Sequence, residues 1–194
     1  MGTVILIIVA ILLLLAAFLL IRTFLFIRKA SDSTADDLPA VELAPLTLDA
    51  DLAASHLSEA IKIETISHED PADNVAENFE KLHRLLSRTY PNIVKTLKRE
   101  VVGEGSLLYT WKGTDPTLDP VLFAAHQDVV PAEETSLQDW VHPPFSGAIA
   151  DGYIWGRGTL DIKSQLISLL EAVEQLIANG YQPERSVYLG FGCD

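Results

Sequence analysis

Cysteine is almost absent from this sequence of 194 residues, in which Cys193 is the only one. A single thiol excludes an internal disulfide and a zinc cluster built from several cysteines. Basic residues are also scarce, with 14 Lys and Arg against 27 Asp and Glu and a formal net charge of −13. Such a surface repels phosphate backbones, so we expect no nucleic-acid partner. Any metal site must use histidine and carboxylate ligands.

Two common catalytic patterns are missing as well. The glycine pairs Gly156/Gly158 and Gly190/Gly192 complete neither the GxGxxG fingerprint nor the Walker loop. No GxSxG elbow is present for a serine nucleophile. The sequence therefore favours neither a dinucleotide enzyme nor a serine hydrolase.

A long apolar run occupies the N-terminus. Every residue from 4 to 21 is apolar, which reaches the ~18 residues needed to span a membrane. A cleaved signal peptide is the alternative, but no Lys or Arg precedes the run. We therefore predict a single-pass anchor over residues 1–29, in contact with membrane lipid. Arg22, Arg28 and Lys29 follow the span and favour a cytoplasmic domain by the positive-inside rule.

The rest of the chain divides into a polar linker, residues 30–48, and one folded domain, residues 49–194. Apolar spacing predicts helices over residues 49–63, 72–87 and 160–178. Short runs rich in Val, Leu, Tyr and Phe predict strands over residues 93–102, 106–111, 120–125 and 186–191, the first two as a hairpin. A strand, helix and strand over residues 120–191 indicates a crossover unit. We expect an α/β fold in which helices cover a mixed sheet.

Polar residues follow the strand over residues 121–125, whose continuous apolar run predicts burial on both faces. His126 and Asp128 stand directly after it, where ligands bind in open α/β sheets. Their spacing puts both side chains on one side, so Asp128 is able to orient His126 as a metal ligand. A histidine at the edge of the core beside a surface aspartate explains the spacing equally well.

Asp161 lies at the start of the longest predicted soluble helix. An aspartate there has an ordinary role as an N-terminal cap, which the residues alone favour. A carboxylate at a strand-to-helix turn is also able to bridge two cations. The remaining histidines, His56, His68, His83 and His142, have no ligand at metal spacing and are expected to be solvated or locally hydrogen-bonded.

Three ordered segments carry a family resemblance: AAHQDVVP over residues 124–131, WVHPPFSGAIADGYIWGRGTLDIK over 140–163 and YLGFGCD over 188–194. Together they resemble the co-catalytic zinc exopeptidases of the aminoacylase, acetylornithine deacetylase and carboxypeptidase S family. The branch with carboxypeptidase S and the N-fatty-acyl-amino-acid synthase/hydrolases is the most similar. That family often places its catalytic domain outside the cytoplasm, so the membrane sidedness stays open.

The resemblance implies two zinc ions, with His126 binding one zinc, Asp161 bridging both and Asp128 acting as the catalytic residue that orients His126. Gln127 departs from the apolar residue that is common at this position, and its side chain is expected to point away from the metals. The implied reaction is zinc-dependent hydrolysis of an amide bond in a peptide C-terminus or an N-acyl amino acid.

In the family a Glu-Glu pair, later ligands and a lid domain follow the position at which this sequence reaches Asp194. We therefore expect a truncated catalytic domain, inactive alone, and a possible homodimer only in the complete protein. We also expect its last strand to expose an unpaired edge. The alternative is a non-catalytic, membrane-tethered binding module with an exopeptidase-like half-domain.

Overall fold

The computed structural model describes residues 2–32, 48–68, 70 and 74–193. The chain divides into two units, residues 1–45 and residues 46–194. The first contains α1, Gly2–Asp32, of which residues 2–28 are long and apolar enough to cross a membrane, a test that a signal sequence also passes. Most of the predicted linker, residues 33–47, lies outside the described residues. The predicted domain boundaries therefore stay predictions.

The predicted helices of the second unit are present with shifted ends. The first is α2, Ala50–Ile61, which begins after Asp49 because the Asp49 side chain accepts a hydrogen bond from Leu52 N at 3.0 Å. The second is α3, Ala76–Thr89. The third is α5, Ser164–Ala178, and it starts later than predicted because a kinked turn, η4 at Thr159–Lys163, precedes it, with Asp161 and Ile162 in non-helical conformations.

The predicted strand over residues 93–102 was wrong in its first half. Residues Pro91–Thr96 form a short helix, α4, and only Lys98–Val102 form the strand β1. Proline at the first helical position favours this start. Ile93 and Leu97 are both buried, and they are spaced as one helical face requires.

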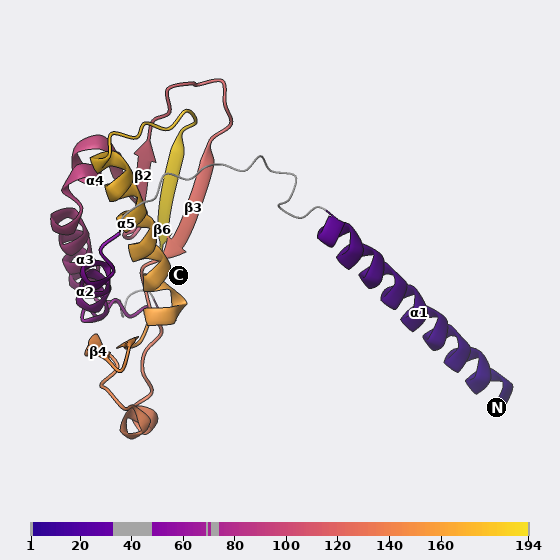
Figure 1. Cartoon of the computed structure of the whole chain (residues 1–194). Helices are drawn as coiled ribbons and strands as arrows, with labels where there is room; N and C mark the ends of the chain where they lie inside the picture. The colour runs from indigo at the N-terminus through magenta and orange to yellow at the C-terminus, as the bar shows by residue number, and fades with distance from the viewer. Residues whose placement is uncertain (1, 33–47, 69, 71–73, 194) are drawn as a thin grey trace. The chain divides into compact units, whose positions relative to one another are not determined.

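The main sheet is four-stranded, in the order β1-β2-β6-β3. Its other members are β2 at Ser106–Trp111, β3 at Val121–His126 and β6 at Val187–Gly192. The β1–β2 hairpin and the β2–β6 pair are antiparallel, whereas β3 and β6 run parallel. Figure 1 shows β2, β6 and β3 side by side with helices along one face. The prediction of a helix-covered mixed sheet is confirmed.

Two expectations about the strands were wrong. The strand over residues 121–125 is not buried on both faces, because Leu122 is 61% exposed and Phe123 45% exposed. The described helices cover only one face of the sheet, and β3 is one of its two edge strands. The final strand, β6, is not an unpaired edge, since it lies between β2 and β3.

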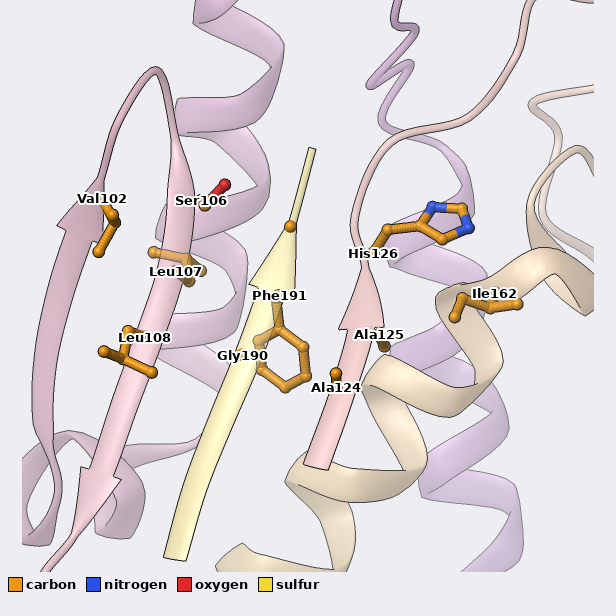
Figure 2. A pocket seen from close by; sticks show the side chains of 11 residues that line it. Val102, Ser106, Leu107, Leu108, Ala124, Ala125, His126, Ile162, Gly190 and Phe191 are labelled. Carbon is orange, nitrogen blue, oxygen red and sulfur yellow. The ribbon is translucent and has the colours of Figure 1, made fainter. Parts of the chain in front are cut away.

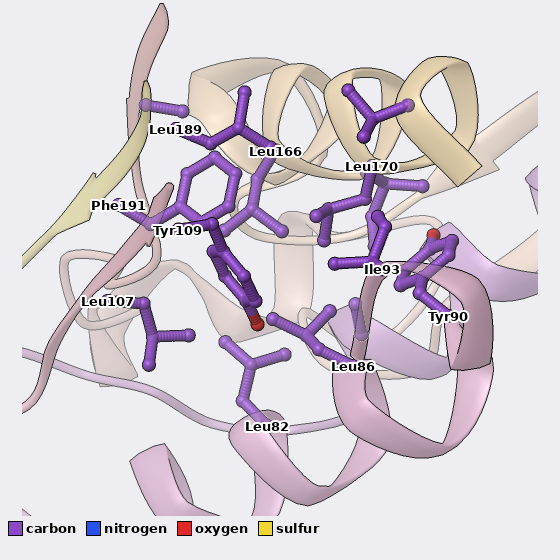
Figure 3. Packing of buried hydrophobic residues seen from close by; sticks show 14 of the residues in the cluster. Leu82, Leu86, Tyr90, Ile93, Leu107, Tyr109, Leu166, Leu170, Leu189 and Phe191 are labelled. Carbon is purple, nitrogen blue, oxygen red and sulfur yellow. The ribbon is translucent and has the colours of Figure 1, made fainter. Parts of the chain in front are cut away.

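The hydrophobic core lies between the sheet and the helices. Figure 3 shows Leu166 and Leu170 of α5 facing Tyr109 of β2 and Phe191 of β6. Tyr109 and Phe191 make an edge-to-face contact with ring centroids 6.0 Å apart. This packing places α5 against β6. Because β3 pairs with β6, the end of β3 lies close to η4, the turn before α5.

A second, two-stranded sheet was not predicted. It consists of β4, Ala148–Ala150, and β5, Tyr153–Trp155, after a short 3-10 helix, η3, at Glu134–Asp139. Each strand has only three residues, too few for a clear alternation of polar and apolar side chains. The hairpin leads into η4.

Candidate metal site

The carboxyl ends of β3 and β6 meet at one edge of the sheet because the two strands are parallel. His126, the last residue of β3, is opposite Gly192 of β6. Figure 2 shows the His126 side chain leaving the tip of β3 toward the turn that carries Ile162. This is the position at which α/β sheets bind ligands.

The backbone of the segment after His126 is held on two sides. Gln127 N donates to Gly192 O at 3.0 Å, and Thr65 Oγ1 donates to Gln127 O at 2.6 Å. Val129 N donates to Thr65 O at 2.9 Å. The residues that follow β3 are therefore fixed by β6 on one side and by the segment after α2 on the other.

Asp161 lies in a turn that packs against this segment. Gly158 has φ +82°, a conformation that favours glycine, and a Cβ there would lie 2.3 Å from Val129 Cγ1. Asp161 itself is extended, with φ −122° and ψ 96°. The N-cap residue of α5 is Lys163, and it makes no side-chain capping bond. Asp161 therefore does not cap α5, the role that its position alone favours.

The turn brings the Asp161 carboxylate onto the imidazole. His126 Nε2 lies 3.0 Å from Asp161 Oδ1, and the Asp161 side chain is 84% exposed. On the other side of the ring, His126 Nδ1 lies 3.0 Å from Asp128 O and 3.3 Å from Asp128 Oδ1. The structure thus brings together the three residues that the sequence singles out.

The Asp128 carboxylate is oriented by a second contact. Ser67 Oγ donates to Asp128 Oδ2 at 2.6 Å. Asp128 Oδ1 is buried and has no hydrogen-bond partner among the described residues. Because it lies 3.3 Å from His126 Nδ1, a hydrogen on Nδ1 would face this unsatisfied acceptor. The tautomer with its hydrogen on Nδ1 satisfies the Asp128 oxygens. It leaves the Nε2 lone pair directed toward Asp161.

The charge on His126 follows from these contacts. Burial lowers the pKa of His126, but hydrogen bonds to Asp161 and Asp128 and the charges of both carboxylates outweigh it, and the pKa is raised overall. Nε2 and Asp161 Oδ1 are two electron-pair donors that converge on one point. A proton or a metal cation satisfies both.

A pocket of about 420 Å³ opens at this pair. Ser67, His126, Asp128 and Asp161 line it, together with Trp140 and Arg157. The Arg157 guanidinium lies 5.5 Å from the centre of the Trp140 ring. Beside it, a pocket of about 520 Å³ on the open face of the sheet is lined mainly by apolar side chains (Figure 2).

Gln127 points away from the pocket, as expected, into a buried polar cluster. Its side chain is fully buried and donates to Gly105 O at 2.7 Å and Phe191 O at 3.3 Å. The amide oxygen lies 2.9 Å from His83 Nε2. The expectation that His83 is solvated or locally bonded was wrong, since it is buried on α3 and its pKa is lowered by burial, against the bond to Gln127.

Lys163 is a residue near the site that the sequence reasoning missed. Its side chain is only 1% exposed, and Nζ donates to Ala60 O at 3.0 Å and Ile63 O at 2.8 Å. Burial lowers its pKa to about 7, with the charge of Asp128 acting in the opposite direction. Its position directly after Asp161-Ile162 is the only signal that the sequence offered.

Within the described part of the chain, no group of three or more His, Cys, Asp or Glu side chains is arranged to hold a metal ion. His126 and Asp161 are therefore a pair of candidate ligands. One imidazole nitrogen and one carboxylate are ligand types that divalent metal ions, zinc among them, take in proteins.

Known proteins were compared with this chain by sequence. Residues 122–194 match the family model described as Peptidase family M20/M25/M40. The probable carboxypeptidase S-like 2 of Dictyostelium discoideum is 46% identical over 143 residues, which are 73% of this chain and 27% of that protein. Carboxypeptidase S of Saccharomyces cerevisiae is 44% identical over 145 residues, 71% of this chain and 25% of that protein.

A human relative is named for a different activity. The human N-fatty-acyl-amino acid synthase/hydrolase is 41% identical over 140 residues, which are 71% of this chain and 27% of that protein. The chain thus spans about a quarter of the length of these relatives.

Solved structures agree on the fold. An M20 family metallo-carboxypeptidase of Sulfolobus solfataricus has a TM-score of 0.58 at 21% identity and covers 72% of this chain, which covers 30% of it. Human carnosine dipeptidase 1 has a TM-score of 0.57 at 22% identity, with 73% of this chain and 31% of that chain covered. Residues 122–194 thus match peptidase family M20/M25/M40, and this chain is similar to parts of carboxypeptidase S and of the N-fatty-acyl-amino acid synthase/hydrolases.

Proposed function

We propose that this chain supplies part of the metal centre of a zinc-dependent amide hydrolase. The observation that carries the proposal is the 3.0 Å separation of His126 Nε2 and Asp161 Oδ1 at the carboxyl end of β3. The similarity to known proteins gives the reaction class, because the relatives named above are carboxypeptidases or acyl-amino-acid hydrolases.

The residues fit a divalent cation. Asp128 Oδ1, buried beside His126 Nδ1, holds the imidazole in the tautomer whose Nε2 is free to ligate. Asp161 is exposed on the pocket side and has two oxygens, as a bridging ligand requires. In this proposal His126 binds one zinc, Asp161 bridges two, and Asp128 orients His126. Bound zinc would polarise a carbonyl and lower the pKa of water.

The substrate class follows from the relatives. Their names contain both carboxypeptidase and N-fatty-acyl-amino acid hydrolase, so we assign to the whole protein a peptide C-terminus or an N-acyl amino acid. Two ligands do not complete a catalytic zinc site, which usually has three from the protein. The 194-residue chain alone is therefore expected to be inactive. A homodimer of the complete protein stays a prediction.

The N-terminal helix is assigned to the membrane. Its described side chains, residues 2–28, are exposed, and most of them are apolar over a length that spans a bilayer. The proposal is a single-pass anchor over residues 1–29, a linker over 30–48 and a catalytic part over 49–194. Protease protection and carbonate extraction of membranes from cells that express the chain test it, since a cleaved signal would release a shorter, soluble product.

Zinc titration calorimetry on the full chain in detergent micelles tests whether His126 and Asp161 are zinc ligands. Binding should weaken at least tenfold in H126A and in D161N. Two controls remove a comparable group elsewhere: H142A changes a histidine whose ring lies tilted against Trp155, and D151N changes an exposed aspartate in the β4–β5 turn. Equal zinc affinity in all five proteins would contradict the proposal and favour a non-catalytic binding module. In the complete protein, amide hydrolysis should stop when the metal is chelated.

A further inference from the structure

Lys163 follows Asp161 in the chain by two residues, but it does not line the pocket at His126 and Asp161. Its side chain is 1% exposed, and no carboxylate lies within ion-pair distance of Nζ among the described residues. A buried ammonium is costly unless its protons are bonded. Nζ meets this need with two backbone carbonyls, Ala60 O at 3.0 Å and Ile63 O at 2.8 Å.

Ala60 lies in the last turn of α2, and Ile63 lies two residues after the helix ends. The last carbonyls of a helix lack partners within it and carry partial negative charge, which a cation stabilises. The last turn of α2 contains no basic residue of its own. Lys163 supplies a hydrogen-bond donor to these carbonyls from a position 100 residues after Ile63 in the chain.

The segment after α2 continues directly to the site. Thr65 bonds the backbone of Gln127 and Val129, and Ser67 Oγ holds Asp128 Oδ2 at 2.6 Å. On the other side, Lys163 N donates to Gly158 O at 2.9 Å and closes the turn that contains Asp161. Lys163 is therefore the link between the turn that presents Asp161 and the segment that holds Asp128.

We propose that Lys163 is a positioning residue for His126 and Asp161: its buried amino group joins the Asp161 turn to the end of α2 and the residues that follow it, and so sets the separation of Asp161 from His126. This role rests on the proposed function. It goes beyond the ligands, because Lys163 touches neither His126 nor the pocket and acts only through the backbone it holds.

Cobalt(II) is a suitable probe because its visible absorption reports both affinity and ligand geometry. The full chain in detergent micelles is titrated with Co²⁺ as wild type, K163M and K163R, after circular dichroism has established the helix content of each. The matched control is K62M, which removes an exposed lysine paired with Glu59 at the same end of α2.

The proposal predicts an order of Co²⁺ affinity. K62M should equal wild type, K163R should bind more weakly, and K163M should lose at least tenfold with an altered visible spectrum. Wild-type affinity and spectrum in a folded K163M would overturn the positioning role alone. If K163M does not fold, K163R decides, since wild-type affinity and spectrum in K163R overturn the role. Failure of the wild type to bind Co²⁺ would contradict the proposed function, in which His126 and Asp161 bind a divalent metal ion.

Discussion

His126 Nε2 and Asp161 Oδ1 lie 3.0 Å apart although 35 positions separate them in the chain. The parallel pairing of β3 with β6 and the tight turn at Gly158 bring them together. His126 gains a raised pKa from this contact and from Asp128, against the effect of burial. Each of the following predictions changes one of the contacts that set this geometry.

Replacing Asp161 with asparagine should lower the pKa of His126, because the imidazolium loses a charged hydrogen-bond partner. The measurement is an NMR titration of the His126 ring resonances in wild type, D161N and the control D151N. The raised pKa in the folded protein stabilises it below the unfolded value of 6.5, and this stabilisation is lost as the pH rises through the folded pKa. An unchanged His126 pKa in D161N would show that the two groups do not interact.

Removing the Ser67 hydroxyl should destabilise the second unit. S67A deletes the hydrogen bond to the buried Asp128 carboxylate, a loss of about 1.5–3 kcal/mol for a charged acceptor. S136A is the control, since Ser136 Oγ bonds only an exposed backbone carbonyl, Glu133 O. Urea unfolding followed by tryptophan fluorescence measures both, and equal midpoints would contradict the role given to Ser67.

Replacing Gln127 with leucine should lower the free energy of unfolding more than the same replacement of the exposed Gln182. Q127L removes the hydrogen-bond partner of the buried His83 Nε2, at about 1–3 kcal/mol for a buried unsatisfied group, and the bond to the half-buried carbonyl of Gly105. Q182L is matched to it, because Gln182 also bonds one backbone carbonyl, Lys112 O, but is exposed. The free energies of unfolding from urea titrations should differ by at least about 1 kcal/mol. Equal values would mean that the cluster adds no stability.

Alanine substitutions at Gly158 and Gly152 distinguish backbone strain from a steric collision of the added methyl group. Both have a positive φ, +82° and +79°, so an alanine at either position costs about 1–2 kcal/mol of backbone strain. Only at Gly158 does the new Cβ collide with Val129 Cγ1, whereas nothing lies within 4 Å at Gly152. G158A should therefore be the less stable by about 1–3 kcal/mol in thermal unfolding. Equal losses would contradict the close packing of the Asp161 turn.

Most of the architecture could be predicted from local patterns. The apolar spacing gave the helices that became α2, α3 and α5, and turn residues gave the β1–β2 hairpin. The helix at Pro91–Thr96 was missed, although Pro91 at its first position and the spacing of Ile93 and Leu97 were available signals. An apolar run cannot distinguish a strand covered on both faces from an edge strand with one open face, and β3 is of the second kind.

The site was predictable only in part. Strand ends and the family resemblance pointed to His126, Asp128 and Asp161, and the structure brings these three together. Lys163 and His83 were missed because their partners are not local in sequence: the backbone of Ala60 and Ile63 for Lys163, and the Gln127 amide for His83. Their burial depends on tertiary packing, which no spacing pattern encodes.

Anomalous diffraction at the zinc edge tests the central claim most directly. Crystals of the full chain grown with Zn²⁺ should show a peak about 2.0–2.2 Å from both His126 Nε2 and an Asp161 carboxylate oxygen, the usual lengths of such zinc bonds. The same data on D161N should show the peak lost or much weaker. A strong zinc peak elsewhere, with none between His126 and Asp161, would contradict the account.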